Sequence, residues 1–549
     1  MESVELVESV ELDRLMLDAQ VLDEQVLDEQ VLDRQVPDEQ APETVWKRLR
    51  EDWLILVREA YVHAQWIEQV RDRRRQLAQK AEQMAREPRF NYARPVVLVA
   101  EPAPQQFLAA FWAAQLANWT IVLANPKWGL REWHAASRQI QPDLIWGECI
   151  PESVFSPPVR RRCVDLKIGA EEPQILIPTG GTSGGVKFAS HTWKTLMSSA
   201  DGFRQYFAPD APVYSYCVLP LYHVSGLMQV LRSAVSGGQV AIAASKPLER
   251  NEAAHPLPFS ADFGTGEHRP LRVLSLVPTQ LQRLLESDRS AWLKQFEAVL
   301  LGGAPPWPAL LDAAQAQRIP LSLSYGMTET AAMVTALKPQ DFLCGDRSSG
   351  APLPHATVTI IKDGASLPAN QVGQIVIKAA SIPLSSSESD QTLITDDLGY
   401  FSPNGHLHIV GRASQMIISG GENIAPTEVE AAIRSTGKVS DVCVVGICDA
   451  EWGEAVAAAY VPQSDAVTVR DLQASLQQVS CQQASLQQVS LQPVPLQQVS
   501  LSQAIPVLSR YKHPKYWLAL KSLPRNAQGK INRQVLNAQI QAQLNLLSN

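Results

Sequence analysis

The sequence predicts an α/β fold, with a large N-terminal domain of helix-covered sheets followed by a small C-terminal α+β domain. Short apolar strands alternate with helical patterns through the middle of the chain, an order that implies parallel sheets covered by helices. After Gly411 and Arg412 this alternation restarts on a smaller scale. The chain has 549 residues, enough for several domains, and we place the two domains at 43–413 and 414–541.

Each predicted element comes from a short apolar run or from a helical period. In the large domain, residues 104–117 form a helix, and the strands lie at 95–100, 120–124, 175–178, 213–219, 239–244, 273–277, 298–301 and 322–324. In the small domain, a helix at 426–435 precedes strands at 439–446 and 455–461. The apolar stretch 107–124 indicates a buried helix and strand, not a membrane span, because it carries Gln115, Asn118 and Thr120.

Two low-complexity repeats interrupt this pattern. Residues 21–40 repeat the pentapeptide Val-Leu-Asp-Glu-Gln with small changes, and a period of five fits neither a helix nor a strand. We therefore predict an acidic tail over 1–42, disordered or partly helical, and favour inert repeat expansion over partner binding. A second repeat of period ten, uncharged and rich in Gln, Ser, Leu and Val, covers 474–503 and predicts a loop insertion at about 472–505.

Composition argues against several classes of function. Residues 1–40 hold a net charge of −11, which leaves +3 on the remainder of a chain whose net charge is −8, so no basic surface for nucleic acid is expected. Seven scattered cysteines without a CxxC spacing argue against a zinc or disulfide framework and favour a reducing, cytoplasmic location. The acidic N-terminus resembles neither a signal peptide nor a transit peptide.

A glycine-rich segment after the strand at 175–178 predicts a phosphate site. Its glycines let the backbone approach an anion closely, and successive N–H groups in such a turn form an anion-binding nest. The segment is not a Walker A loop, because no glycine directly precedes the lysine and Phe188 follows it. The alternative is a flexible surface loop. The predicted ligands are Thr179, Gly180, Gly181, Thr182, Ser183, Gly184 and Lys187.

Two further segments carry polar groups suited to a nucleotide. Tyr325 can stack on a base, Thr328 can donate to a phosphate, and Glu329 offers an oxygen ligand to Mg²⁺. The same segment also fits a helix N-terminus with a Thr/Glu capping arrangement. Asp397 and Arg412 can both reach a ribose if the residues between them form a hairpin. The alternative for this pair is an Asp-rich turn and a surface arginine.

Near the C-terminus, the turn Pro524–Lys530 places a lysine at its tip. Pro and Gly define the turn, and Asn526 and Gln528 make it polar. A single loop lysine is usually a solvated charge. The upstream nucleotide-like segments, in their set order, favour a catalytic role for Lys530.

Together these segments identify the chain as a member of the adenylate-forming superfamily, which includes acyl-CoA synthetases, peptide-synthetase adenylation domains and luciferases. The resemblance covers roughly residues 44–540, apart from the repeats. It rests on five motifs in order: Thr179–Lys187, Tyr325–Thr330, Thr395–Gly399, Gly411–Pro426 and Pro524–Lys530. The chain departs from the family pattern at Gly180 (usually Ser or Thr), Val186 (usually Pro), Asp396 (usually Gly) and Gln415 (usually Asp or Lys).

The resemblance implies an ATP-dependent acid–CoA ligase that uses ATP, Mg²⁺ and coenzyme A. The acid attacks the α-phosphate of ATP, and AMP then leaves when the CoA thiol attacks. Between the two steps the small domain rotates about a hinge at Gln415. The family's motifs, carried over to this chain, assign catalysis to Lys530, Thr328 and His223, the metal to Glu329, and the nucleotide to the phosphate loop with Gly303, Ala304, Tyr325, Gly326, Asp397 and Arg412.

Within the superfamily, the chain resembles most the o-succinylbenzoate–CoA ligases of naphthoquinone (menaquinone or phylloquinone) biosynthesis. This rests on the short N-terminal portion, on His191-Thr192, and on Leu219–Gly226 with Arg232 nine residues beyond His223. It implies His191, Ser225 and Arg232 as substrate residues, with Arg232 binding the acid's free carboxylate. The alternatives are a surface position for Arg232 and a structural role for His223. For the whole chain they are a CoA ligase for another aryl or short-chain acid, and a non-catalytic scaffold.

Overall fold

The computed structural model describes most of the chain between residues 41 and 548. The described ranges are 41–49, 53–56, 63–85, 94–147, 150–151, 154–155, 172–180, 186–243, 257–259, 269–383, 391–449, 452–476, 508–525 and 531–548. The predictions for the acidic tail, for the repeat after residue 476, for the centre of the phosphate loop and for Lys530 fall outside these ranges.

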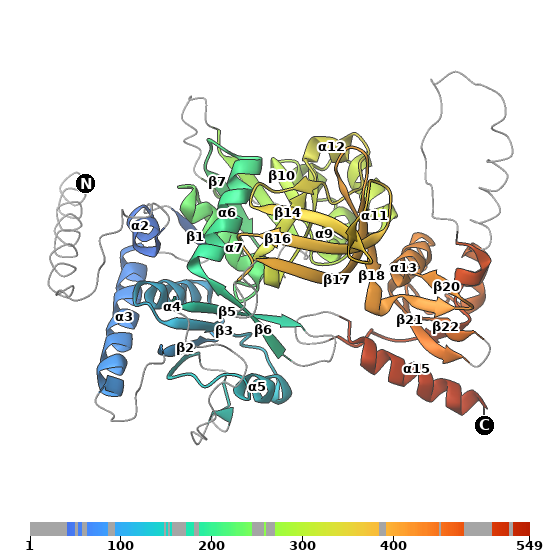
Figure 1. The fold of residues 1–549 in the computed structure, drawn as a ribbon, viewed down its shortest axis with the longest axis horizontal. Coiled ribbons are helices and arrows are strands. Elements are labelled where there is room, and N and C mark those ends of the chain that lie inside the picture. The colour runs from blue at the N-terminus through green and yellow to red at the C-terminus, as the bar shows by residue number, and fades with distance from the viewer. Residues whose placement is uncertain are drawn as a thin grey trace.

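The first sheet of the large domain has five strands in the order β4-β2-β3-β5-β6. All its pairs are parallel except the antiparallel hairpin of β5 and β6. The strands are β2 (Val96–Val99), β3 (Thr120–Leu123), β4 (Leu144–Trp146), β5 (Gln174–Gly180) and β6 (Val186–Thr192). As Figure 1 shows, the helices beside this sheet are α3 (His63–Ala85), α4 (Pro104–Leu116) and α5 (Leu130–Ser137).

The second sheet has eight strands in the order β1-β8-β7-β9-β10-β11-β12-β13. From β1 to β11 in this order, neighbouring strands pair in parallel. Strands β12 and β13 then add antiparallel pairs at one edge. The strands are β1 (Leu54–Leu56), β7 (Val213–Cys217), β8 (Val240–Ile242), β9 (Leu271–Leu276), β10 (Ala298–Leu301), β11 (Leu321–Met327), β12 (Ala332–Ala336) and β13 (Ala351–Pro352). The loops after β7, β10 and β11 therefore emerge at one edge of the sheet, where α/β proteins place their ligands.

One apolar cluster joins the two sheets through helices. Helices α4, α6 (Trp193–Phe207) and α7 (Val224–Val235) contribute to the cluster together with both sheets; its members include Ile121, Ile175, Ala113, Leu196, Leu227 and Cys217. Short helices complete the second sheet's layer: α9 (Pro278–Glu286), α10 (Ser290–Leu293), α11 (Pro308–Ala316) and α12 (Pro339–Leu343). The predicted parallel sheets covered by helices are confirmed.

The sequence did not predict a third sheet, which is fully antiparallel. Its order is β15-β14-β16-β17-β18, with β14 (Ala356–Lys362), β15 (Ala365–Ser366), β16 (Gly373–Ala379), β17 (Thr392–Phe401) and β18 (Leu407–Arg412). The strands bury alternate residues, such as Ile360 on β14 and Ile375 on β16. A search for continuous apolar runs misses strands of this kind, because only one face of each is apolar.

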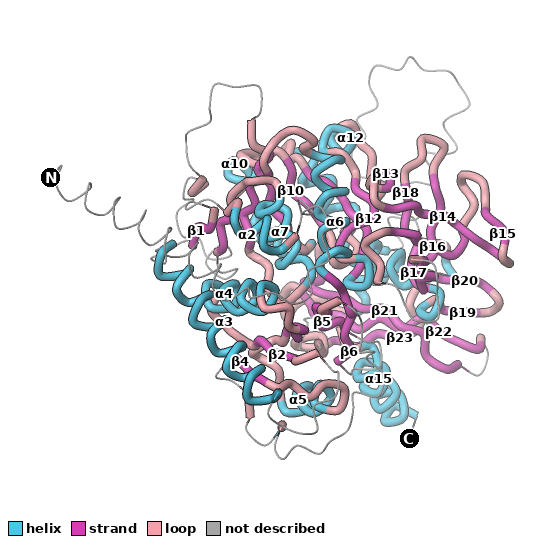
Figure 2. The backbone as a smooth tube through the Cα atoms, turned by 60° about the vertical axis from the view of Figure 1, so that its left-hand side comes forward, coloured by secondary structure: helices cyan, strands magenta, loops and turns pink. Residues whose placement is uncertain are grey.

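The small domain begins after the linking turn Ala413–Gln415. It contains β19 (Ile417–Ser419), β20 (Glu422–Ile424), α13 (Pro426–Ser435), β21 (Val439–Asp449), β22 (Gly453–Pro462), β23 (Tyr516–Ala519) and α15 (Arg533–Ser548). In Figure 2, β19 to β23 lie together with α15 beside them. This sheet with its helices confirms the predicted α+β class. Among the described residues, no helix is long and apolar enough to cross a membrane.

The first residues assigned to the predicted insertion, 472–476, belong to the small domain. Residues 469–476 are helical, and Leu472 and Leu476 are buried in the core of the small domain. Leu476 belongs to the first copy of the period-ten repeat, so this copy starts inside a packed helix. Repetition in a sequence does not reveal which copy has an apolar surface to pack against.

This boundary gives a prediction for deletions. Removing residues 1–40, or replacing 477–503 with a short Gly/Ser linker, should leave kcat and KM unchanged, because long surface insertions cost little free energy. Extending the replacement to 474–503 removes Leu476 and should lower the free energy of unfolding by about 2–4 kcal/mol. Urea unfolding of the 477–503 and 474–503 replacement variants, with Leu476→Ala as the matched control, checks this. Equal stability of the two replacement variants would contradict the boundary at residue 476.

Candidate active site

Three predicted nucleotide residues from distant segments form one hydrogen-bonded group. The Tyr325 hydroxyl donates to Oδ2 of Asp397 at 2.7 Å, and Nε of Arg412 donates to Oδ1 at 3.0 Å. Asp397 and Arg412 pair directly across the β17–β18 hairpin. The condition set by the sequence, a hairpin between them, is therefore met, and Asp397 lies in a strand and not in a turn.

Burial shapes the electrostatics of this group. Asp397 is buried, while Arg412 reaches solvent. Burial, with the charge of Asp397 as the next cause, raises the pKa of Tyr325 well above its ordinary value. The tyrosine therefore stays protonated and donates its hydrogen to the carboxylate. Asp397 remains an acceptor with lone pairs to spare for a hydroxyl pair.

The segment after Tyr325 is held in an uncommon backbone conformation. Residues Thr328–Thr330 form a short 3₁₀ turn, and Ala331 and Ala332 follow it with φ of 52° and 84°. Non-glycine residues rarely adopt positive φ, and such strain clusters at functional sites. Two hydroxyl groups hold it: Ser199 Oγ donates to the Ala331 carbonyl at 2.6 Å, and Thr330 Oγ1 donates to the Ala332 carbonyl at 2.6 Å.

His191 supports this same turn. Its ring is fully buried, Nε2 donates to the Thr328 carbonyl at 2.7 Å, and Nδ1 lies 3.2 Å from Thr195 Oγ1. Both ring nitrogens are thus engaged inside the protein. The geometry favours a positioning role for His191 over the predicted contact with the substrate.

The side chains of Thr328 and Glu329 remain available. Both residues are half-buried, and neither side chain makes a hydrogen bond or ion pair with the described residues. In the described part of the chain, no group of three or more His, Cys, Asp or Glu side chains is arranged to hold a metal ion by itself. Mg²⁺ typically takes one or two carboxylates together with substrate phosphates and waters, and Glu329 fits that mode.

The phosphate loop joins two antiparallel strands. Thr179 and Gly180 end β5 and pair with Lys187 and Val186 on β6. Gly181, Thr182, Ser183 and Gly184 lie outside the described residues, so their predicted roles stay predictions. Lys187 is exposed and has no partner among the described residues. The hairpin distinguishes this loop from a Walker A loop, which leads from a strand into a helix.

Two predicted nucleotide glycines flank this site, Gly303 in the loop after β10 and Gly326 in strand β11. Gly303, with φ of 80°, and Ala304 are exposed in the loop after β10. A Cβ on Gly326 would lie 2.0 Å from the Ala332 carbonyl of β12. Gly326 is therefore required by the β11–β12 pairing whether or not a nucleotide contacts it.

Helix α7 and its N-cap carry three predicted site residues, which differ in how deeply they are buried. His223 occupies the N-cap position, with its ring centroid 4.6 Å from that of Tyr222, and Ser225 is exposed in the first turn. Arg232 lies nine residues beyond His223, roughly 13 Å of helix rise. It is only 3% exposed, so the surface alternative is wrong.

The guanidinium of Arg232 lies against α6 and the β13–β14 turn. It stands 4.3 Å over the ring of Phe203, and its Nε and Nη2 have no hydrogen-bond partner among the described residues. His355, packed against Gly202 of α6, also has both ring nitrogens buried without such a partner. Burial lowers the pKa of Arg232 to about 9, so it stays charged at neutral pH.

The hinge residue Gln415 lies in the turn that links the third sheet to the small domain. Next to it, Asp396 accepts hydrogen bonds from the backbone N–H of Ser414, at 3.1 Å, and from its hydroxyl. Asp396 thus ties the linker to β17. Lys530 is not described, but Arg525 and Ile531 pair across the base of its turn.

Comparison with known proteins shows the family. The AMP-binding enzyme family model matches residues 74–383, and the model for the AMP-binding enzyme C-terminal domain matches 428–530. The chain belongs to the AMP-binding enzyme family. The 2-succinylbenzoate–CoA ligase of Enterococcus faecalis is 32% identical over 363 residues, which cover 64% of this chain and 67% of that protein.

Solved structures agree with this fold. The O-succinylbenzoate coenzyme A synthetase (MenE) of Bacillus subtilis, in complex with AMP, covers 90% of this chain with 23% identity and a TM-score of 0.68. A double mutant of the same enzyme, bound with the product analogue OSB-NCoA, covers 90% with a TM-score of 0.56. The predicted superfamily and its resemblance to o-succinylbenzoate–CoA ligases are confirmed.

For this AMP-binding enzyme, the sequence did not single out several supporting residues. Thr195, Ser199 and Gly202 follow one another at spacings of four and three on α6, so small or polar side chains share one helix face. That spacing could have indicated a face packed against backbone. His355 carried no such signal, because Gly202, against which it packs, lies far away in the sequence.

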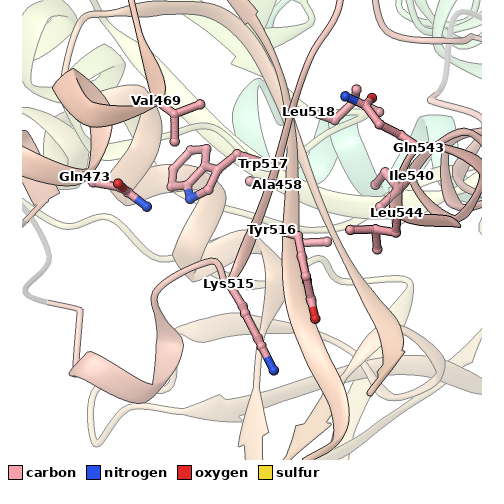
Figure 3. Close-up of a pocket in the computed structure, with 11 residues that line it drawn as sticks. Ala458, Val469, Gln473, Lys515, Tyr516, Trp517, Leu518, Ile540, Gln543 and Leu544 are labelled. Atoms are coloured by element: carbon pink, nitrogen blue, oxygen red, sulfur yellow. The ribbon is translucent and has the colours of Figure 1, made fainter. Parts of the chain in front are cut away.

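A cavity of about 290 Å³ in the small domain is separate from this site. Figure 3 shows its lining around β23, with Trp517 near Val469 and Gln473, and Tyr516 and Leu518 on the side of α15. None of the predicted site residues lines it.

The buried imidazole of His191 predicts acid sensitivity. Burial lowers its pKa from 6.5 to about 4, so the unfolded chain binds this proton at a higher pH than the folded one. The stability contribution is complete above pH 6.5 and is lost as the pH falls toward 4, by up to about 3 kcal/mol. Urea unfolding of His191→Gln should show a weaker pH dependence between these values. The exposed His134→Gln is the control, and an equal change in both would refute the assignment.

Proposed function

We propose that this chain is an acid–thiol ligase that adenylates a carboxylic acid with ATP and transfers the acyl group to CoA, and that its acid is o-succinylbenzoate. This activity belongs to menaquinone or phylloquinone biosynthesis. The observation that carries the proposal is the 32% identity to a 2-succinylbenzoate–CoA ligase over two thirds of that protein's length. The convergence of Tyr325, Asp397 and Arg412 supports it.

Adenylation makes a poor electrophile reactive. A carboxylate oxygen of the acid bonds to the α-phosphorus of ATP, and pyrophosphate leaves with its electron pair. Negative charge spreads over the phosphoryl oxygens in the transition state. Positioning and electrostatic stabilisation therefore account for most of the lowering of the activation barrier. Thr328, the phosphate loop and Lys530 would face that charge.

Mg²⁺, when bound, would neutralise charge on the phosphate oxygens, and the free carboxylate of Glu329 would hold it. The nucleotide's ribose would bind to Asp397, whose orientation Tyr325 and Arg412 already define. Gly303 and Ala304 follow β10 at the same sheet edge and would lie along the base.

The free carboxylate of o-succinylbenzoate would bind to Arg232. A buried, unpaired positive charge is costly, and the N–H groups of Nε and Nη2 can donate two parallel hydrogen bonds to one carboxylate. Phe203 lies against the flat face of the guanidinium and orients it.

The second step uses a different position of the small domain. In our proposal the domain turns about Ala413–Gln415 and withdraws Lys530, and His223 lines the acyl tunnel that the CoA thiol enters. The thiol sulfur bonds to the acyl carbon, and AMP leaves with the electron pair. A cytoplasmic location suits ATP and CoA as substrates. It also suits the four described cysteines, which are free thiols, because thiols stay reduced in that compartment.

Pyrophosphate release with a panel of acids tests the proposal. O-succinylbenzoate should give release and, with CoA, its thioester by mass spectrometry. Release with another aryl or short-chain acid alone would favour the ligase for that acid. No release with any acid would favour the scaffold.

A further inference from the structure

A cation–π contact joins the two domains at the far end of α13. Arg434, in the last turn of α13, places its guanidinium carbon 5.1 Å from the ring centroid of Trp307. Trp307 is the N-cap residue of α11 and lies three residues after Ala304, in the loop proposed to hold the nucleotide. Figure 1 shows α11 and α13 side by side.

Arg434 is fixed within its own domain. Its Nη2 donates to Oδ1 of Asp441 and to the Val442 carbonyl, both at 3.0 Å. The other carboxylate oxygen of Asp441 accepts from Arg525. Arg525 opens the turn that carries Lys530 and pairs with Ile531 at its base. A continuous chain of charged contacts therefore runs from the nucleotide loop to the base of the lysine turn.

The contact lies away from the linker, so the proposed rotation about Ala413–Gln415 would separate Arg434 from Trp307. At the start of α13, Thr427 donates to the Val410 carbonyl at 3.2 Å, next to the linker. Arg434 lies seven residues further along, roughly 10 Å from that anchor. Beside it, a cavity of about 160 Å³ separates the domains, lined by Gln282, Glu286, Trp307, Arg434 and Gly437, among others. The cation–π contact between Arg434 and Trp307 spans the two domains at the edge of this cavity.

The domain arrangement indicates which step the contact serves. This structure superposes on the AMP complex of the Bacillus subtilis enzyme with a TM-score of 0.68, and on the product-analogue complex with 0.56. We infer that Arg434 is a positioning residue for adenylate formation. Its contact with Trp307 holds the small domain in the arrangement seen here, and Asp441 transmits that position to the base of the Lys530 turn. This inference rests on the proposed two-step reaction.

Half-reaction rates test the inference. Pyrophosphate–ATP exchange reports adenylate formation, and thioester formation from supplied acyl-adenylate reports the second step. Arg434→Met and Trp307→Leu should each slow exchange by roughly fivefold to thirtyfold and leave thioester formation unchanged or faster. Arg434→Lys should recover part of the exchange rate. The double variant should be no slower than either single one, because both remove the same contact. Lys512→Met is the control, since Lys512 pairs with Glu428 on α13 without reaching the large domain.

A structural readout keeps the test independent of the acid. Cys344 of the large domain and Cys448 of the small domain are exposed free thiols, and spin labels there report the distance between domains once Cys149, Cys163 and Cys481 are changed to serine. Arg434→Met should broaden or shift this distance, whereas Lys512→Met should not. If the wild type adenylates no acid, the proposed function fails while the distances still decide on Arg434. Unchanged distances, or an equal loss in both half-reactions, would overturn the inference.

Discussion

Replacing Lys530 with alanine should lower the rate of adenylate formation by about a thousandfold, which corresponds to about 4 kcal/mol of transition-state stabilisation. The ammonium group would face the negative charge that develops on the phosphoryl oxygens. Thioester formation from supplied acyl-adenylate should be largely intact, because the proposed rotation withdraws this lysine before the second step. Pyrophosphate–ATP exchange and a thioester assay separate the two effects.

Lys521→Ala is the matched control for Lys530→Ala. Lys521 is an exposed lysine on the same domain, nine residues away, so its loss should change neither half-reaction. If Lys530→Ala slowed both half-reactions equally, the mechanism with two domain positions would be wrong.

Replacing Arg232 with methionine should weaken recognition of o-succinylbenzoate by about 3–5 kcal/mol in kcat/KM, a loss of a hundredfold or more. KM for ATP should be nearly unchanged. The physical reason is that a carboxylate left in a buried site without its cation loses its solvation and gains nothing in return. Arg232→Lys should keep the charge but lose the bidentate geometry, and so retain part of the activity.

Stability should move in the opposite direction to activity. Arg232 carries a buried charge whose Nε and Nη2 lack partners among the described residues, so Arg232→Met should raise the Tm or leave it unchanged. The decisive measurement is the kcat/KM ratio between o-succinylbenzoate and a monoacid without its second carboxylate. Arg204→Met, on the solvent side of α6, is the control. A ratio that does not move with Arg232→Met would remove this arginine as the selector.

Local motifs could be predicted because their cause is local. Helix α13 begins and ends at the predicted residues 426 and 435, since a proline opens it and its apolar period is regular. The hairpin between Asp397 and Arg412 could be stated as a condition, and the register of β17 and β18 meets it. The family itself followed from five short motifs in order.

Contacts between distant segments could not be predicted in this way. The bond from His191 to the Thr328 carbonyl joins residues 137 positions apart, and no sequence pattern records such a meeting. The third sheet was missed because its strands bury one face only. The first copy of the period-ten repeat was placed outside the fold because its sequence does not reveal the packing of Leu476.

By itself the sequence determined the superfamily, the two-domain α/β organisation and the residue types available for adenylation, because these depend on local backbone and side-chain chemistry. The tertiary structure alone decided which of these groups meet. It brought Tyr325 to Asp397, engaged both nitrogens of His191 inside the protein, and buried Arg232 against Phe203. The physical reason is that burial and long-range partners set the charge state and availability of a side chain, and both arise only when the sheets and helices pack.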